Sequence, residues 1–225
     1  MTASFHMATK TLAAGRIFVW ASILLASSAM ASDVGKRFPP EMRTFVDAKT
    51  GVTVTALTTG TFNDAKIYQT HPQWTSDGQY VIFRSNRAAG RGSQAFAVNE
   101  ITGDIIQLTE GATNTRSLNV ARKSNKLYFF RGGMGMAAQL IELNLDPLVA
   151  DSQAGKMKGP ASYERAVGTM PADLRESGGF TLDADEKSAY IGVGKVPPGG
   201  GRGASAGLGR NPQDGPPDGR GHRSD

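Results

Sequence analysis

Nitrogen and sulfur side chains that ligate transition metals are scarce in this 225-residue chain. It has no cysteine, and its three histidines lie far apart at His6, His71 and His222. A transition-metal site needs several imidazole, thiolate or carboxylate ligands that converge on one point, so a single histidine does not make one. The sequence therefore predicts no metal ligand within this chain.

Two short stretches match catalytic or cofactor-binding motifs by letter only. Gly203–Gly207 reads G-x-S-x-G, the nucleophile elbow of hydrolases, but that elbow needs a strand before it and a helix after it. Here it lies among glycines and prolines, so we reject it. Gly133–Ala138 fits G-x-G-x-x-A, but a strand pattern follows it instead of a helix, which favours a loop between two strands.

A repeated β-hairpin is the main structural signal. In its clearest copy, Asp77-Gly78 supplies the backbone freedom that a tight turn needs, and aromatic and β-branched residues up to Phe83 follow. In the second copy Phe130 comes 47 residues after Phe83. The three copies are His71–Arg87, Asn119–Arg131 and Phe180–Val193.

A second repeat is a Thr-Gly turn followed by a strand that ends in Leu-Thr, at Thr50–Thr58 and again at Thr102–Thr109. Together with a strand at Ala95–Asn99, this gives four strands in about 50 residues, which is typical of a β-propeller blade. We predict an all-β fold of four-stranded antiparallel blades in an incomplete ring. Residues 44–194 should form about three blades, with Thr44–Thr58 as the outermost strand of a closing blade.

The connections between these strands carry weaker patterns. The alternation in Leu140–Leu145 predicts another strand. Residues 151–174 are polar and weakly patterned, and we expect a short helix near Pro171–Arg175.

The blade residues resemble known families. Trp74–Arg87 (WTSDGQYVIFRSNR), followed by a strand and TGDIIQLTEG, is similar to the blade repeat of propellers related to TolB. Phe45–Thr58 (FVDAKTGVTVTALT) and Lys66–Phe83 (KIYQTHPQWTSDGQYVIF) resemble the start of the oligogalacturonate lyases, which are propeller enzymes of pectin breakdown. The resemblance covers about residues 45–193. It implies a propeller that acts by β-elimination on oligogalacturonides.

The oligogalacturonate lyases are understood to hold a divalent metal, typically manganese, through a cluster of His and Gln, and to remove the proton beside the uronate carboxylate. No stretch of this chain matches that cluster. The resemblance therefore implies that metal and catalysis belong to longer relatives, and that this chain is an inactive fragment.

Propeller geometry singles out a few positions for ligand contact, because the loop that feeds each inner strand opens onto one face of the ring. Arg116 is the first candidate for binding an acidic oligosaccharide, since a guanidinium meets a carboxylate through two parallel hydrogen bonds. His71 is the second. The alternative is that Arg116 is a solvated loop charge and His71 a hydrogen-bonded turn residue.

The two ends of the chain differ from the middle. Residues 1–31 have two basic residues, no acid, the apolar run Ile17–Ala26 and the small-residue site Ala29-Met30-Ala31, which predicts a secretory signal peptide cleaved near Ala31. Residues 32–43 should be a leader. Residues 195–225 hold nine Gly and five Pro, which predicts a disordered tail, either a natural one or the product of a reading-frame change.

Charge excludes one class of partner. Of the net charge of +5, residues 1–31 carry +2 and residues 195–225 carry +2, which leaves +1 for the folded part. We find no basic stripe with interleaved aromatics, so the sequence predicts no nucleic-acid binding and, after signal cleavage, no membrane contact. Two functions stay open: a periplasmic or secreted oligogalacturonate lyase-like protein, and a non-catalytic TolB-like scaffold for protein partners.

Overall fold

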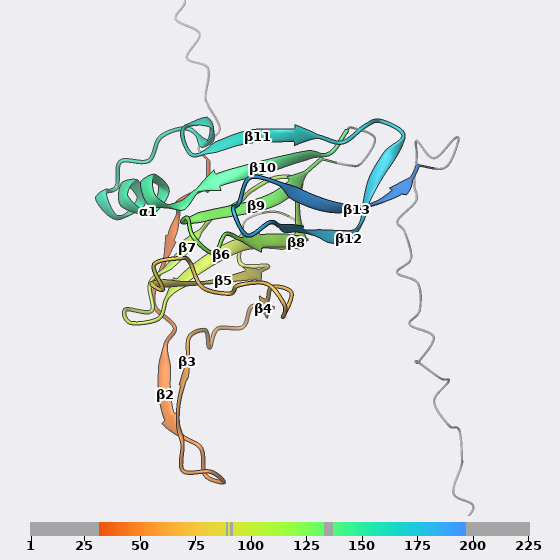
Figure 1. Ribbon diagram of the computed structural model, residues 1–225. Helices are drawn as coiled ribbons and strands as arrows, with labels where there is room; N and C mark the ends of the chain where they lie inside the picture. The colour runs from red at the N-terminus through yellow and green to blue at the C-terminus, as the bar shows by residue number, and fades with distance from the viewer. Residues whose placement is uncertain (1–31, 89, 91, 133–136, 197–225) are drawn as a thin grey trace, which may run out of the picture. The chain divides into compact units, whose positions relative to one another are not determined.

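The computed structural model describes residues 32–88, 90, 92–132 and 137–196 (Figure 1). The predicted signal peptide and nearly all of the predicted tail lie outside these residues. No helix in the described ranges is long and apolar enough to cross a membrane. The elements are β1 (Arg37–Phe38), β2 (Arg43–Val46), β3 (Thr53–Ala56), β4 (Ala65–Lys66), β5 (Tyr80–Ser85), β6 (Gln94–Asn99), β7 (Ile105–Gln107), β8 (Thr113–Val120), β9 (Lys126–Arg131), β10 (Gln139–Asn144), α1 (Leu145–Ala154), η1 (Pro160–Ser162), β11 (Glu164–Thr169), β12 (Leu174–Leu182) and β13 (Ala189–Lys195).

Strand pairing divides the described chain into three consecutive β units. Unit 1 is a five-stranded antiparallel sheet in the order β1-β7-β6-β5-β4, and unit 2 is a four-stranded sheet in the order β11-β10-β9-β8. Unit 3 contains the pair β12-β13. The predicted all-β fold with propeller-like antiparallel blades and no closed ring is confirmed. Within the predicted leader, β1 pairs with β7.

The one α-helix of the described residues interrupts unit 2 between β10 and β11. The side-chain oxygen of Asn144 accepts a hydrogen bond from the backbone N–H of Asp146 at the helix start, and Gly155 ends the helix with a φ of 64°. The predicted short helix near Pro171–Arg175 is wrong, because this stretch leads into β12. The predicted strand at Leu140–Leu145 is β10, although Leu145 already belongs to α1.

Residues 44–58 do not form one outer strand, and that prediction is wrong. They belong to a separate hairpin in which β2 and β3 pair only with each other. Its turn is fixed by Asp47, whose carboxylate accepts hydrogen bonds from the backbone N–H groups of Lys49 and Thr50. Gly51, with a φ of 72°, completes the turn.

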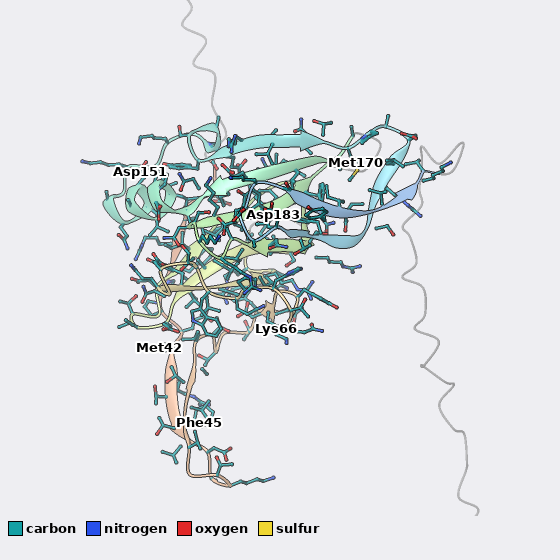
Figure 2. All side chains as sticks on the ribbon, viewed as in Figure 1. Met42, Phe45, Lys66, Asp151, Met170 and Asp183 are labelled. Carbon is teal, nitrogen blue, oxygen red and sulfur yellow. The ribbon has the colours of Figure 1, made fainter. Side chains whose placement is uncertain are left out.

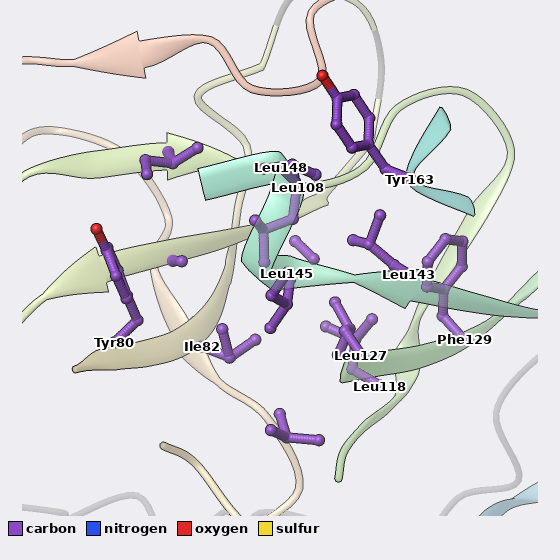
Figure 3. Packing of buried hydrophobic residues seen from close by; sticks show 14 of the residues in the cluster. Tyr80, Ile82, Leu108, Leu118, Leu127, Phe129, Leu143, Leu145, Leu148 and Tyr163 are labelled. Atoms are coloured by element: carbon purple, nitrogen blue, oxygen red, sulfur yellow. The ribbon is translucent and has the colours of Figure 1, made fainter. Parts of the chain in front are cut away.

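Apolar side chains join successive units face to face. The largest core cluster holds 17 buried residues, with Ile82 and Ala97 from unit 1 packed against Leu127, Phe129 and others from unit 2 and α1 (Figure 3). A second cluster of six buried residues joins unit 2 to Phe180 of unit 3. A third lies on the other face of unit 1, around Phe83 and Phe96. Packing of consecutive four-stranded sheets through their faces is the architecture of a propeller.

Register shows how the units correspond. The pairs Trp74↔Val81 and Val120↔Leu127 close equivalent hairpins, so unit 2 follows unit 1 after 46 residues. The spacing of 47 residues between Phe83 and Phe130 is therefore one residue too long, and Phe83 corresponds to Phe129. Phe83 belongs to the outer cluster of unit 1, whereas Phe130 faces unit 3, because a shift of one residue moves a side chain to the opposite face.

Candidate functional site

The innermost strand of each unit departs from regular pairing in its middle. In β8 the register shifts between Asn114 and Asn119, and in β12 it shifts between Glu176 and Phe180. In unit 1 the corresponding irregular stretch runs from β4 to the bridge at Trp74. Such bulges re-aim side chains and are common beside binding sites. The two candidates from the sequence, His71 and Arg116, both lie in these irregular segments.

His71 lies in the irregular stretch of unit 1. Its backbone N–H donates to the Tyr68 carbonyl at 3.0 Å, and the two rings stack at a tilt with centroids 5.5 Å apart. The amide nitrogen of Asn119 lies 3.5 Å from His71 Nδ1. Burial, and secondly the positive charge of Arg122, lower the pKa of His71 below its usual value. His71 is therefore neutral at pH 7, with Nδ1 placed to accept a hydrogen bond from Asn119.

A cavity of about 290 Å³ opens beside this pair. It takes residues from all three units, since His71 comes from unit 1, Asn119 and Arg122 from unit 2, and Asp183 from the turn of unit 3 (Figure 2 labels Asp183). Asn119 also donates to the backbone carbonyl of Phe180 at 2.9 Å. The full lining is Thr70, His71, Pro72, Asn119, Val120, Arg122, Thr181, Leu182, Asp183, Ala184 and Glu186.

The charged groups of the cavity differ in how far they are already engaged. The Asp183 carboxylate accepts backbone N–H bonds from Lys187 at 2.8 Å and Ser188 at 3.1 Å, which lower its pKa. The Glu186 carboxylate accepts from the Lys123 backbone N–H and the Ser124 hydroxyl. Arg122 makes no ion pair among the described residues. The cavity therefore offers a guanidinium and an imidazole to a polar ligand.

Arg116, the first candidate from the sequence, lies outside this cavity. It is exposed in the bulge of β8, and its backbone N–H donates to the side-chain oxygen of Asn114 at 3.1 Å. The Asn114 amide in turn donates to Glu176 of unit 3 at 2.9 Å. The structure thus places His71 in a cavity and Arg116 on an exposed bulge. A role of Arg116 in ligand binding remains a prediction.

The sequence interpretation missed Asn119, Arg122 and the turn of unit 3. Asn119 and Arg122 lie at the start of the second hairpin, but nothing in their types or spacing marks them as neighbours of His71, which is 48 residues away from Asn119. Only the packing of one unit on the next brings them together. The structure shows Asn119 as a buried polar residue at 3% exposure, which no feature of the sequence indicated.

The surroundings of His71 do not fit a manganese ion. Manganese favours carboxylate, carbonyl and water oxygens, whereas His71 Nδ1 faces the Asn119 amide and the nearby carboxylates already accept backbone N–H bonds. No group of three or more His, Asp or Glu residues in the described ranges could hold a metal ion.

Consecutive antiparallel units packed face to face, each with an irregular inner strand, define a propeller-type all-β protein. No family model matches the chain, and no curated protein sequence matches it. Solved structures do match, among them two oligogalacturonate lyases. One is an oligogalacturonate lyase in complex with manganese, with a TM-score of 0.54 and 24% identity. The other is an oligogalacturonate lyase from Vibrio parahaemolyticus, with a TM-score of 0.54 and 21% identity.

Each match covers 68% of this chain and 35% of the lyase, so the chain spans about a third of the length of these enzymes. At this level of identity the matches establish the fold. The predicted resemblance to oligogalacturonate lyases is thereby confirmed in three dimensions.

Proposed function

We propose that this chain is an oligogalacturonate lyase-like protein of pectin oligosaccharide breakdown. The observation that carries this proposal is the fold match to two oligogalacturonate lyases at a TM-score of 0.54. In the proposed setting the protein is exported to the periplasm by its N-terminal segment, cleaved near Ala31. Its ligand is a short, acidic oligogalacturonide.

The described residues suit binding better than catalysis. The Arg122 guanidinium could pair with a uronate carboxylate, while neutral His71 could hydrogen-bond to a sugar hydroxyl. Arg116, on its exposed bulge, could contact a second sugar. β-Elimination also requires a base that removes the proton next to the carboxylate, and the resemblance assigns that step to a cluster of His and Gln in the longer lyases that no stretch of this chain matches. We therefore propose that this chain binds oligogalacturonides without cleaving them.

Calorimetry and fluorescence can test this binding. After removal of residues 1–31, Trp74 is the only tryptophan, and it lies three residues from His71. We expect trigalacturonate to bind, its methyl ester to bind at least tenfold more weakly, and no unsaturated uronate to form. Arg122→Ala should weaken binding by about 10- to 100-fold, the range of ~1.5–3 kcal/mol for a hydrogen bond to a charged group.

Lys156→Ala is the matched control, because it removes one exposed positive charge far along the sequence from the cavity and should leave the affinity unchanged. Arg116→Ala tests the second subsite in the same titration. Equal affinity for the acid and the methyl ester would overturn the proposal and would favour the alternative of a TolB-like scaffold.

A further inference from the structure

The β2-β3 hairpin is a copy of the two outer strands of a blade. In the hairpin, Val46 pairs with Thr53, Phe45 with Val54 and Thr44 with Thr55. In unit 1, β6 and β7 pair as Val98↔Ile105, Ala97↔Ile106 and Phe96↔Gln107. Each residue of the hairpin corresponds to the residue 52 positions later in unit 1, so the two strand pairs have the same register.

The turns match as well. Asp47 and Asn99 each accept two backbone N–H bonds from the residues two and three positions later. Gly51 and Gly103 follow with φ angles of 72° and 74°. The hairpin is therefore the third and fourth strands of a blade whose first and second strands are not beside it.

Unit 3 is complementary. Its pair β12-β13 corresponds to the first and second strands of unit 2, because Thr181↔Tyr190 repeats the pair Asn119↔Tyr128. The described part of the chain provides no partner for the outer edge of β13, and Tyr190 and Val193 are 65% and 49% exposed. The hairpin likewise exposes Phe45 and Val46, at 41% and 63% (Figure 2 labels Phe45). Open edges of this kind readily accept a further strand.

Within the described residues, the two half-blades of one chain lie apart. The base of the hairpin is fixed to unit 1, where Glu41 accepts bonds from the buried guanidinium of Arg87 at 2.9 Å and from the backbone N–H of Gly60 at 3.0 Å. Arg87 lies over the rings of Phe83 and Phe96, on the face of unit 1 that does not contact unit 2. β13 lies beyond unit 2, so the whole of units 1 and 2 separates the two half-blades.

We propose that the partner is a second copy of this chain, and that the hairpin of each copy completes unit 3 of the other. Two copies then contribute four complete blades and two composite blades, which close into a six-bladed ring with two-fold symmetry. Six lies within the range of four to eight blades found in propellers, and the closed ring leaves only the short outer edges of its blades.

The proposal fixes the register of the new contact. In unit 1, β6 pairs with β5 through Ala97↔Ile82 and Phe96↔Phe83. The same relation across two copies sets Phe45 opposite Tyr190 and Thr44 opposite Ile191. An aromatic pair directly across two antiparallel strands is stabilising.

Disulfide trapping can test this register, because the chain has no cysteine of its own. A chain with Phe45→Cys is mixed with a chain with Tyr190→Cys, and a chain with Thr44→Cys with a chain with Ile191→Cys. At least one of these two mixtures should form a disulfide, because adjacent pairs in an antiparallel ladder alternate and one of the two has the closer, non-hydrogen-bonded geometry. Thr44→Cys with Tyr190→Cys should not, because these side chains point to opposite faces. Ile101→Cys, in the equivalent turn of unit 1 and 79% exposed, is a second control.

Light scattering on the unmodified chain should give twice the mass of one chain. Phe45→Asp should shift the protein to monomer, whereas Val52→Asp, 58% exposed in the hairpin turn, should leave the dimer intact. A monomeric unmodified chain, a larger open assembly, or crosslinking that ignores the register would each overturn the proposal. So would an intramolecular disulfide in a chain that carries both Phe45→Cys and Tyr190→Cys.

Discussion

The amide group of Asn119 contacts all three units at once. It lies 3.5 Å from His71 of unit 1, belongs to the inner strand of unit 2, and donates to the Phe180 carbonyl of unit 3. Since Asn119 is buried, an apolar replacement would leave the Phe180 carbonyl without its donor. A single side chain thus couples the cavity to the packing of the blades.

The lowered pKa of His71 offers a direct residue-scale test. Burial is the larger cause and the charge of Arg122 the smaller, so Arg122→Ala should raise the pKa of His71 but leave it below 6.5. When the pKa of a histidine is lower in the folded than in the unfolded state, its contribution to stability is fully present above the unfolded pKa. That contribution is lost as the pH falls from the unfolded pKa toward the folded pKa. Titration of the His71 ring protons by NMR, assigned with His71→Gln, measures the change. An unchanged pKa in Arg122→Ala would show that burial acts alone.

Glu142 should control stability in acid. Its carboxylate accepts bonds from Arg165 at 2.7 and 2.9 Å and from the Tyr128 hydroxyl at 2.7 Å, and it lies 3.3 Å from the Lys126 ammonium. The Arg165 bond is the main reason why the pKa of Glu142 falls to about 2, and burial together with Glu142 raises the pKa of Tyr128. A carboxylate with a lowered folded pKa stabilises the fold above its unfolded value and loses that contribution as the pH falls toward 2.

Because Arg165 is 68% exposed, solvent screening reduces the contribution of this cluster to about 1–2 kcal/mol. Urea unfolding at pH 7 and pH 3 should show that loss in the parent chain. In Glu142→Gln the loss between the two pH values should be smaller by the same amount. An equal loss in both chains would place the acid sensitivity elsewhere.

At the scale of elements, the hairpin turns form a connected series. Asn125, in the turn of unit 2, accepts from the Ser76 hydroxyl at 2.6 Å and donates to Asp77 at 2.9 Å in the turn of unit 1. The Glu186 carboxylate of unit 3 reaches back to the turn of unit 2, where it accepts from Ser124 at 2.7 Å. The turns of units 2 and 3 are therefore each hydrogen-bonded to the turn of the preceding unit.

Glu186 performs this role from an unfavourable backbone conformation. Its φ of 58° makes it the one non-glycine residue with positive φ in the described ranges, and Gly78 holds the equivalent place in unit 1 with a φ of 72°. Left-handed backbone costs about 1–2 kcal/mol for a residue other than glycine. We expect Glu186→Ala to destabilise the fold by about 2 kcal/mol, because it keeps the strain and loses the bonds to Lys123 and Ser124.

Glu186→Gly loses the same bonds but removes the strain, so it should be about 1 kcal/mol more stable than Glu186→Ala. Chemical unfolding of the parent and both variants separates the two effects. Equal stabilities for the alanine and glycine variants would contradict a strained turn.

The sequence predicted the repeated hairpins because a Gly-containing turn between apolar strands is local information. It could not predict that residues 44–58 form their own hairpin, since the same Thr-Gly strand serves in unit 1 as one member of a larger sheet. The register error between Phe83 and Phe130 has a similar cause, because both are phenylalanines in strand patterns and only packing shows which face each occupies. The cavity around His71 joins three units and leaves no local signal.

At the scale of the whole molecule, the two interfaces between units are unequal. The cluster between units 1 and 2 holds 17 buried residues, including Leu145 and Leu148 of α1, whereas the cluster between units 2 and 3 holds six. Buried apolar area is the main source of stability, so the smaller interface should open first. Unit 3 is therefore the part of the described chain that should detach at the lowest denaturant concentration.

Hydrogen exchange in increasing urea tests this order, measured on the Phe45→Asp variant so that contact between copies does not protect β13. Amides of β12 and β13 should lose protection at lower urea than those of β5 and β9. Phe180→Ala removes the main side chain of unit 3 from the smaller cluster, and its ring contact with Phe130 at 5.3 Å between centroids. It should abolish protection in β12 and β13 while β5 and β9 keep theirs, because the larger cluster is untouched. Simultaneous loss of protection in all four strands would mean that the three units unfold as one cooperative block.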